Sequence, residues 1–206
     1  MIQSPLSRVA GLMALTAGVL TIVAQVGMFL AFVANDRLAT LASPLYLPSM
    51  VTFFVALCAL LIALVAANEW QAHRGGVFGL IGFVAALVGT TALAGNHWFD
   101  TFAGPWLADS APDLLAAPIQ HGVLTTAALA SYGLFAVGWM LFGVASLRAG
   151  VFPAMISASI VVGGAAGFLA LSPPFGIALG IAMLGLGVWL TRTGRVTAPA
   201  LEPVAR

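Results

Sequence analysis

Residues 96–121, NHWFDTFAGPWLADSAPDLLAAPIQH, form the one long polar interruption in an otherwise apolar chain of 206 residues. This stretch contains three of the six acidic residues, two of the three histidines, two of the five tryptophans and no arginine. Because polar side chains are scarce elsewhere, small-molecule or metal chemistry is expected here. The apolar segments on either side decide the fold class.

The composition indicates that the solvent of this chain is lipid. Hydrophobic residues make up 62% of it and charged residues only 6%, whereas a soluble domain carries about 25% charged residues. The net charge of +1 gives no electrostatic footprint for nucleic acid. The single cysteine, Cys58, excludes an internal disulfide. The first apolar run is longer than the roughly 7–15 residues of a signal-peptide core, so we expect it to be retained.

Six segments are long and apolar enough to cross a hydrocarbon core, which takes about 20 helical residues. Helices are the only open-chain way to satisfy backbone polar groups in lipid. The sequence therefore predicts an all-α integral membrane protein, a six-transmembrane-helix bundle with a structured outer loop between its third and fourth helices. The predicted spans are residues 9–33, 49–67, 75–95, 122–147, 153–171 and 175–191.

The arginines predict the orientation. With six spans and the N-terminus inside, only Arg37 falls on the outer side, and the other arginines fall on the inner side. Basic residues accumulate on the cytoplasmic side of membrane proteins. We therefore expect both termini in the cytoplasm and residues 96–121 outside. The absence of lysine is typical of a GC-rich bacterial genome, so the expected location is a bacterial cytoplasmic (inner) membrane. The inner-side arginines are Arg8, Arg74, Arg148, Arg192, Arg195 and Arg206.

Glycines predict how the spans pack. Gly176 and Gly180 form a GxxxG pattern in the last span, and small residues let helix backbones approach closely in lipid. We expect packing within one bundle, although the same glycines could form the seam of an oligomer.

A candidate ligand site follows from residues 96–121. If the third helix continues through the start of this stretch, His97 and Asp100 lie on one face at i,i+3 spacing. Ser110 and Asp113 have the spacing of a capping box, which predicts a short helix after Ser110. The predicted site residues are His97, Asp100, Gln120 and His121, with Trp98, Phe102 and Trp106 as an apolar lining. A mostly apolar lining with a few converging polar groups is typical of ligand sites.

Two cofactors are compatible with this site. His97 and His121 flank the stretch at the same expected depth, as paired haem ligands do in membrane cytochromes. His97, Asp100 and His121 could instead bind a divalent metal through imidazole and carboxylate groups. In the alternative interpretation the histidines only hydrogen-bond lipid headgroups or loop carbonyls.

No Asp, Glu, Lys or Arg falls inside a predicted span, which argues against an ion-coupled transporter. Gln25 is near the middle of the first span, where an interhelical hydrogen bond is expected.

Two further stretches carry a resemblance. The run Leu141–Pro153, LFGVASLRAGVFP, precedes a Gly-rich hairpin that ends at Leu190, and Trp106–Asp113 reads WLADSAPD. From Gly75 onward the chain resembles a group of small multi-pass membrane proteins of high-GC bacteria, a resemblance that implies the architecture and no activity.

The leading functional hypothesis is a non-enzymatic accessory or binding protein for a lipid, a hydrophobic small molecule or a membrane partner. The alternatives are a haem- or quinone-binding redox subunit that uses His97 and His121, and a facilitator for a neutral solute.

Overall fold

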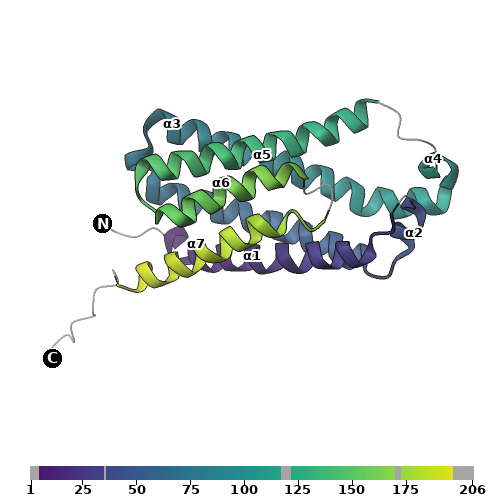
Figure 1. Cartoon of the computed structure of the whole chain (residues 1–206), viewed down its shortest axis with the longest axis horizontal. Helices are drawn as coiled ribbons and strands as arrows, with labels where there is room; N and C mark the ends of the chain where they lie inside the picture. The colour runs from purple at the N-terminus through teal and green to yellow at the C-terminus, as the bar shows by residue number, and fades with distance from the viewer. Residues whose placement is uncertain (1–4, 35, 117–121, 170–172, 197–206) are drawn as a thin grey trace.

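The computed structural model describes residues 5–34, 36–116, 122–169 and 173–196. The described residues form helices and no strands, as predicted (Figure 1). The helices are α1 (Pro5–Ala31), α2 (Arg37–Ala42), α3 (Tyr46–Ser110), α4 (Pro112–Ala116), α5 (Val123–Ala149), α6 (Ala154–Phe168) and α7 (Ile177–Val196). Of these, α2 and α4 are short, and both lie at the end of the molecule where α3 begins and ends.

Helix α3 is two helical arms joined at a sharp break. Gly76 has φ 53° and ψ −155°, a backbone conformation that glycine adopts at little cost and residues with a Cβ disfavour. The first arm, residues 46–75, and the second arm, residues 77–110, therefore run antiparallel (Figure 1). The predicted spans 49–67 and 75–95 leave residues 68–74 as their connection, but these residues are the helical end of the first arm, and the chain reverses at the glycine.

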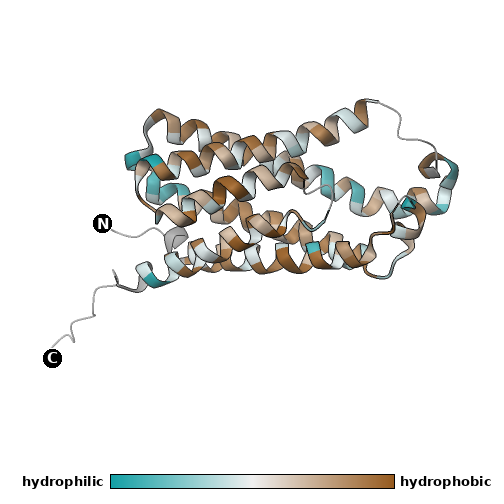
Figure 2. Ribbon diagram, viewed as in Figure 1, coloured by the Kyte–Doolittle hydropathy of each residue, from teal (hydrophilic) through white to brown (hydrophobic). Residues whose placement is uncertain are grey.

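Among the described residues, three helices are long and apolar enough to cross a membrane, namely Val9–Ala31 within α1, α3, and α5. Two shorter apolar helices, Ala154–Phe168 and Ile177–Thr193, accompany them. Apolar residues cover the length of the bundle and hydrophilic ones gather towards its two ends (Figure 2). This distribution fits a protein whose middle lies in hydrocarbon, and it supports the expectation of a membrane protein.

The long helices and the two α3 arms form a closed ring. Helix α1 packs on the first arm of α3, and the second arm of α3 packs on α5. Helix α5 then packs on α6, α6 packs on α7, and α7 packs on α1, which closes the ring. Glycines mark these contacts. A Cβ on Gly138 of α5 would lie 2.5 Å from the Ala85 carbonyl oxygen of α3, and one on Gly163 of α6 would lie 2.7 Å from Leu179 Cα of α7. Such close backbone approach is how helices associate without a hydrophobic force between them.

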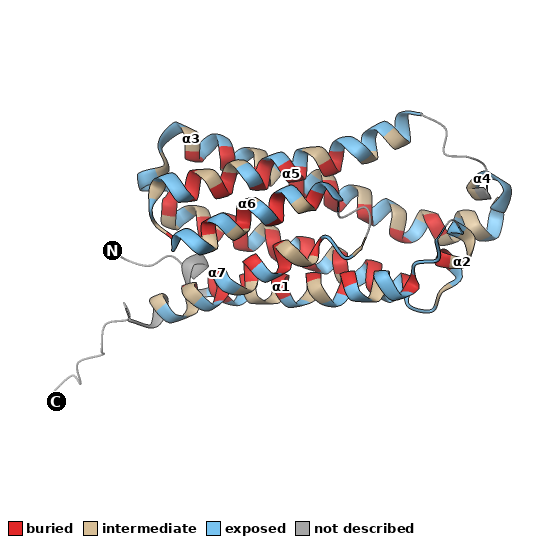
Figure 3. Ribbon diagram, viewed as in Figure 1, coloured by how far each residue is buried: buried red, intermediate tan, exposed pale blue. Residues whose placement is uncertain are grey.

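Buried residues face the inside of this ring (Figure 3). Trp139 and Phe142 of α5 are 1% and 0% exposed, and their rings are 5.7 Å apart. The Trp139 indole N–H donates to Thr90 Oγ1 over 2.9 Å, so the largest core side chain also has its polar atom satisfied. At the α3 break, Ser146 Oγ donates to Gln71 Oε1 over 2.7 Å. These two bonds join α5 to the two arms of α3.

Candidate functional site

The first part of the predicted outer loop is helix. Residues 96–110 continue the second arm of α3, past the predicted end of the span at Gly95 and through Pro105. The arm closes at Ala111, whose N–H donates to Leu107 O over 2.8 Å, and α4 follows at Pro112. Ser110, the predicted N-cap, is instead the last residue of α3. Two predicted site residues, Gln120 and His121, lie outside the described residues.

His97 points into the ring and is only 6% exposed. Its Nε2 lies 3.4 Å from the Tyr132 hydroxyl oxygen of α5. The Phe53 ring of the first α3 arm meets the imidazole edge-on, with ring centroids 4.7 Å apart. The other ring nitrogen, Nδ1, is buried and has no hydrogen-bond partner among the described residues. His97 therefore keeps one nitrogen that could bind a ligand or donate a hydrogen bond.

Asp100 lies near the same cluster, because its charge acts on Tyr132, whose hydroxyl oxygen is 3.4 Å from His97 Nε2. Its backbone carbonyl accepts a hydrogen bond of 3.3 Å from the Tyr46 hydroxyl, and its carboxylate interacts electrostatically with Arg37 at the start of α2. Among the described residues no hydrogen bond joins the His97 and Asp100 side chains, and their predicted pairing stays a prediction. Within the described part of the chain, no three His, Cys, Asp or Glu side chains gather closely enough to hold a metal ion.

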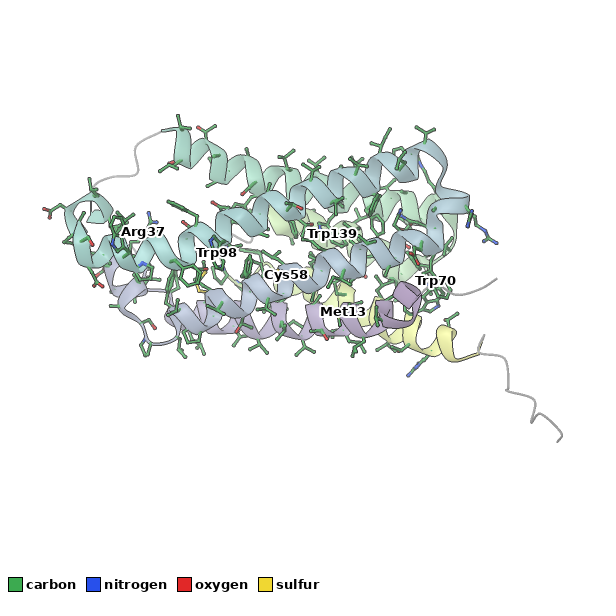
Figure 4. All side chains as sticks on the ribbon, turned by 180° about the vertical axis from the view of Figure 1, so that it is seen from behind. Met13, Arg37, Cys58, Trp70, Trp98 and Trp139 are labelled. Atoms are coloured by element: carbon green, nitrogen blue, oxygen red, sulfur yellow. The ribbon has the colours of Figure 1, made fainter. Side chains whose placement is uncertain are left out.

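The apolar residues of the predicted site lie on the outside of the second α3 arm. Trp98 is 54% exposed, and its ring lies 4.6 Å from that of Phe102 and 5.2 Å from that of Phe54. Together with Val51 and Thr101 these side chains line a groove with about 30 Å³ of free space. We call it the aromatic groove (Trp98 in Figure 4).

The walls of the aromatic groove come from the two arms of α3. Thr101 is its one polar residue, and that hydroxyl already donates to the His97 carbonyl over 2.6 Å. The groove therefore offers carbon surface and aromatic rings. Trp106, the third predicted aromatic, is 64% exposed and does not line the groove.

Sequence reasoning missed Phe53 and Phe54, which place the His97 ring and complete the aromatic groove. They stand side by side in an apolar run, and only the antiparallel pairing of the α3 arms brings them to residues 97–102. Tyr132 is visible in the sequence as a rare polar residue inside a span, but nothing in its spacing identifies His97 as its partner.

The site thus combines a buried His97–Tyr132 pair inside the ring of helices with an exposed aromatic groove on the outer face of the ring. The same part of α3, residues 97–102, contributes to both. Comparison with protein-family models, with curated proteins and with solved structures gives no match for this chain.

Proposed function

We propose that the chain is a six-span protein of a bacterial cytoplasmic membrane with both termini in the cytoplasm. The reversal at Gly76 supports counting the two α3 arms separately, and α1, α5, α6 and α7 supply the other spans. Arg74 and Arg148 lie at one end of the ring, where the Arg148 guanidinium sits 4.4 Å over the Phe78 ring. The opposite end carries Asp36, Asp100, Asp109 and Asp113, with Arg37 as its one described arginine. This charge distribution follows the positive-inside tendency.

The proposed role is non-enzymatic, namely binding of a lipid acyl chain in the aromatic groove. The observation that carries it is the lining of that groove, which presents Val51, Phe54, Trp98 and Phe102 around about 30 Å³ of free space. The groove is on the outer face of a helix apolar enough to span a membrane, close to the predicted outer end of the span, so membrane lipid is its expected neighbour. A groove of this size and apolar lining offers room and carbon surface for a few methylene groups of an acyl chain.

Aromatic rings add energy to such a contact. Moving one CH₂ group from water into an apolar site contributes about 0.8 kcal/mol. A lipid chain that arrives from bulk lipid gains nothing from this hydrophobic term, so its binding is favoured only by packing against the groove. The edge-to-face arrangement of Trp98 and Phe102, at 64°, forms a fixed wall for a chain to lie against. We therefore expect a lipid at this position to exchange more slowly than lipids elsewhere around the ring.

Native mass spectrometry after purification in a mild detergent tests this role. The wild-type protein is expected to retain phospholipid, and the double variant Trp98→Ala/Phe102→Ala to lose it. Trp106→Ala is the matched control, because Trp106 is an equally exposed aromatic on the same arm and does not line the groove. Equal lipid retention by the double variant and the control would contradict the proposal, as would absence of bound lipid in the wild type.

A redox subunit is the second candidate, and the buried, unpartnered Nδ1 of His97 is the observation that favours it. Haem ligated at His97, or a quinone hydrogen-bonded to it, would give a distinct signal. A Soret band in the purified protein, lost in His97→Ala, supports haem. Quinone in an organic extract, lost in the same variant, supports a quinone. A colourless protein whose extract contains no quinone contradicts this second function.

A further inference from the structure

The aromatic groove and the buried His97–Tyr132 pair lie on opposite sides of one seam between the two arms of α3. On the inner side, the ring of Phe53, which is 5% exposed, meets His97 edge-on with ring centroids 4.7 Å apart. The next residue on each arm makes the corresponding contact on the outer side. There the rings of Phe54 and Trp98 are 5.2 Å apart, and both residues line the groove. Two consecutive residues of each arm therefore form both contacts.

Thr101 joins the two sides of the seam. It lines the groove although it is only 1% exposed, and its hydroxyl donates to the backbone carbonyl of His97 over 2.6 Å. The neighbouring Phe102 forms the groove wall, with its ring 4.6 Å from that of Trp98. Because these residues belong to one stretch of helix, a small shift of the second arm moves the groove wall and the His97 ring together.

The contact between His97 and Tyr132 has a length at which a small shift matters. The Tyr132 hydroxyl oxygen lies 3.4 Å from His97 Nε2, whereas hydrogen bonds between nitrogen and oxygen in proteins are usually about 2.7–3.2 Å long. Tyr132 belongs to α5, so the contact crosses from one helix to the next. A movement of the second arm by a few tenths of an ångström therefore either completes this hydrogen bond or breaks it.

The occupancy of the groove acts on the position of this arm. Atoms that line an empty space lack the packing contacts that they would otherwise have on that side, and the groove has about 30 Å³ of free space. An acyl chain in the groove supplies those contacts and holds the second arm more firmly. This reasoning rests on the proposed function, which places an acyl chain there.

We propose that lipid in the aromatic groove regulates the pair inside the ring, by fixing the second α3 arm against α5 and strengthening the His97–Tyr132 hydrogen bond. Such coupling is reciprocal, because two linked equilibria affect each other by the same factor. Loss of the hydrogen bond inside the ring therefore weakens the binding of lipid on its outer face, although Tyr132 does not line the groove.

Nuclear magnetic resonance of protein labelled with ¹⁵N in its histidines tests the first direction. Delipidated protein in dodecyl maltoside is titrated with dioleoylphosphatidylcholine, whose headgroup has no net charge. The imidazole ¹⁵N shifts of His97 are expected to change until the groove is full, because they report hydrogen bonding at the ring nitrogens. The exposed His73, near the α3 break, is the internal control and should not respond. Trp98→Ala/Phe102→Ala should lose the His97 response, and Trp106→Ala should keep it.

The Tyr132→Phe variant tests the reverse direction, because it keeps the aromatic ring and removes only the hydroxyl. Its affinity for the same lipid, measured by titration in native mass spectrometry, is expected to fall about threefold, the factor that corresponds to an average hydrogen bond between membrane helices. Ser159→Ala is the control and should bind lipid as the wild type does. Its hydroxyl donates within its own helix, to the Ile156 carbonyl over 2.8 Å.

The outcomes separate this proposal from the proposed function. If the mass spectra show lipid bound to the wild type while the His97 signals stay unchanged, the coupling is wrong and the groove remains a lipid site. The coupling is also wrong if Tyr132→Phe binds lipid as tightly as the wild type. If the wild type binds no lipid, both proposals are wrong.

Discussion

The contact between the second α3 arm and α5 gives a quantitative test of the fold. A Cβ on Gly138 would lie 2.5 Å from Ala85 O and 2.6 Å from Ala86 Cα. Both obstacles are backbone, so no side chain can turn away to make room. Because an ordinary contact begins at 3.4 Å, Gly138→Ala requires the two helices to separate by about 0.9 Å.

A separation of this size weakens the packing along the contact. A gap of about 0.5–1 Å already forfeits a quarter to a half of the dispersion energy of the atoms it parts. It also stretches the 2.9 Å bond between Trp139 and Thr90, one residue away from the substitution. Overpacking of a filled interior typically costs about 1–3 kcal/mol, and we expect Gly138→Ala to reduce the free energy of unfolding by this amount.

Gly133→Ala is the matched control on the same helix. The nearest atom to its added Cβ would be Phe168 Cε2 at 4.0 Å, and alanine has a better helix propensity than glycine by about 0.8–1 kcal/mol. This variant should be neutral or more stable than the wild type. Unfolding by SDS titration, followed by fluorescence in mixed micelles, measures both free energies. If the two variants agree within about 0.5 kcal/mol, the α3–α5 contact described here is wrong.

Three further outcomes are expected. In a cysteine-free background, a cysteine at Ser110 should react with an impermeant thiol reagent on intact cells and one at Thr193 should not; the reverse pattern contradicts the proposed orientation. Gly180→Leu should lower thermal stability in detergent more than Gly185→Leu, because a Cβ at position 180 would lie 2.8 Å from Ile22 Cγ1 and 3.1 Å from the Gly18 carbonyl oxygen of α1, whereas one at position 185 would meet only a side-chain atom at 3.9 Å; equal effects would place the GxxxG face on lipid. Trp139→Phe removes a buried hydrogen bond between helices, worth about 0.6 kcal/mol in other membrane proteins, and leaves space where the larger indole packed, so in the same SDS titration it should cost more than the hydrogen bond alone.

The candidate site shows where sequence reasoning stopped. It selected His97 and Trp98 because they are rare polar and aromatic residues at the end of an apolar run. The sequence does not show that one of them is buried and the other exposed. Adjacent residues on a helix point about 100° apart, and their burial depends on which helices pack beside each face. His97 consequently faces the ring, whereas Trp98 faces out. Phe54, which also lines the groove, is one apolar residue among many in the sequence. Only the pairing of the two α3 arms brings it beside Trp98.

Composition by itself determined that this chain folds into apolar helices, because a surface with so few charges cannot face water and a backbone in lipid must satisfy its own hydrogen bonds. The apolar run lengths also located most of the helical segments. Tertiary structure alone decided three things: that the chain reverses at Gly76, that residues 96–110 extend α3, and that His97 is buried while the adjacent Trp98 is exposed. Each depends on which backbones pass close together, and a helix in lipid is apolar on every face, so its sequence carries no periodic signal for its neighbours.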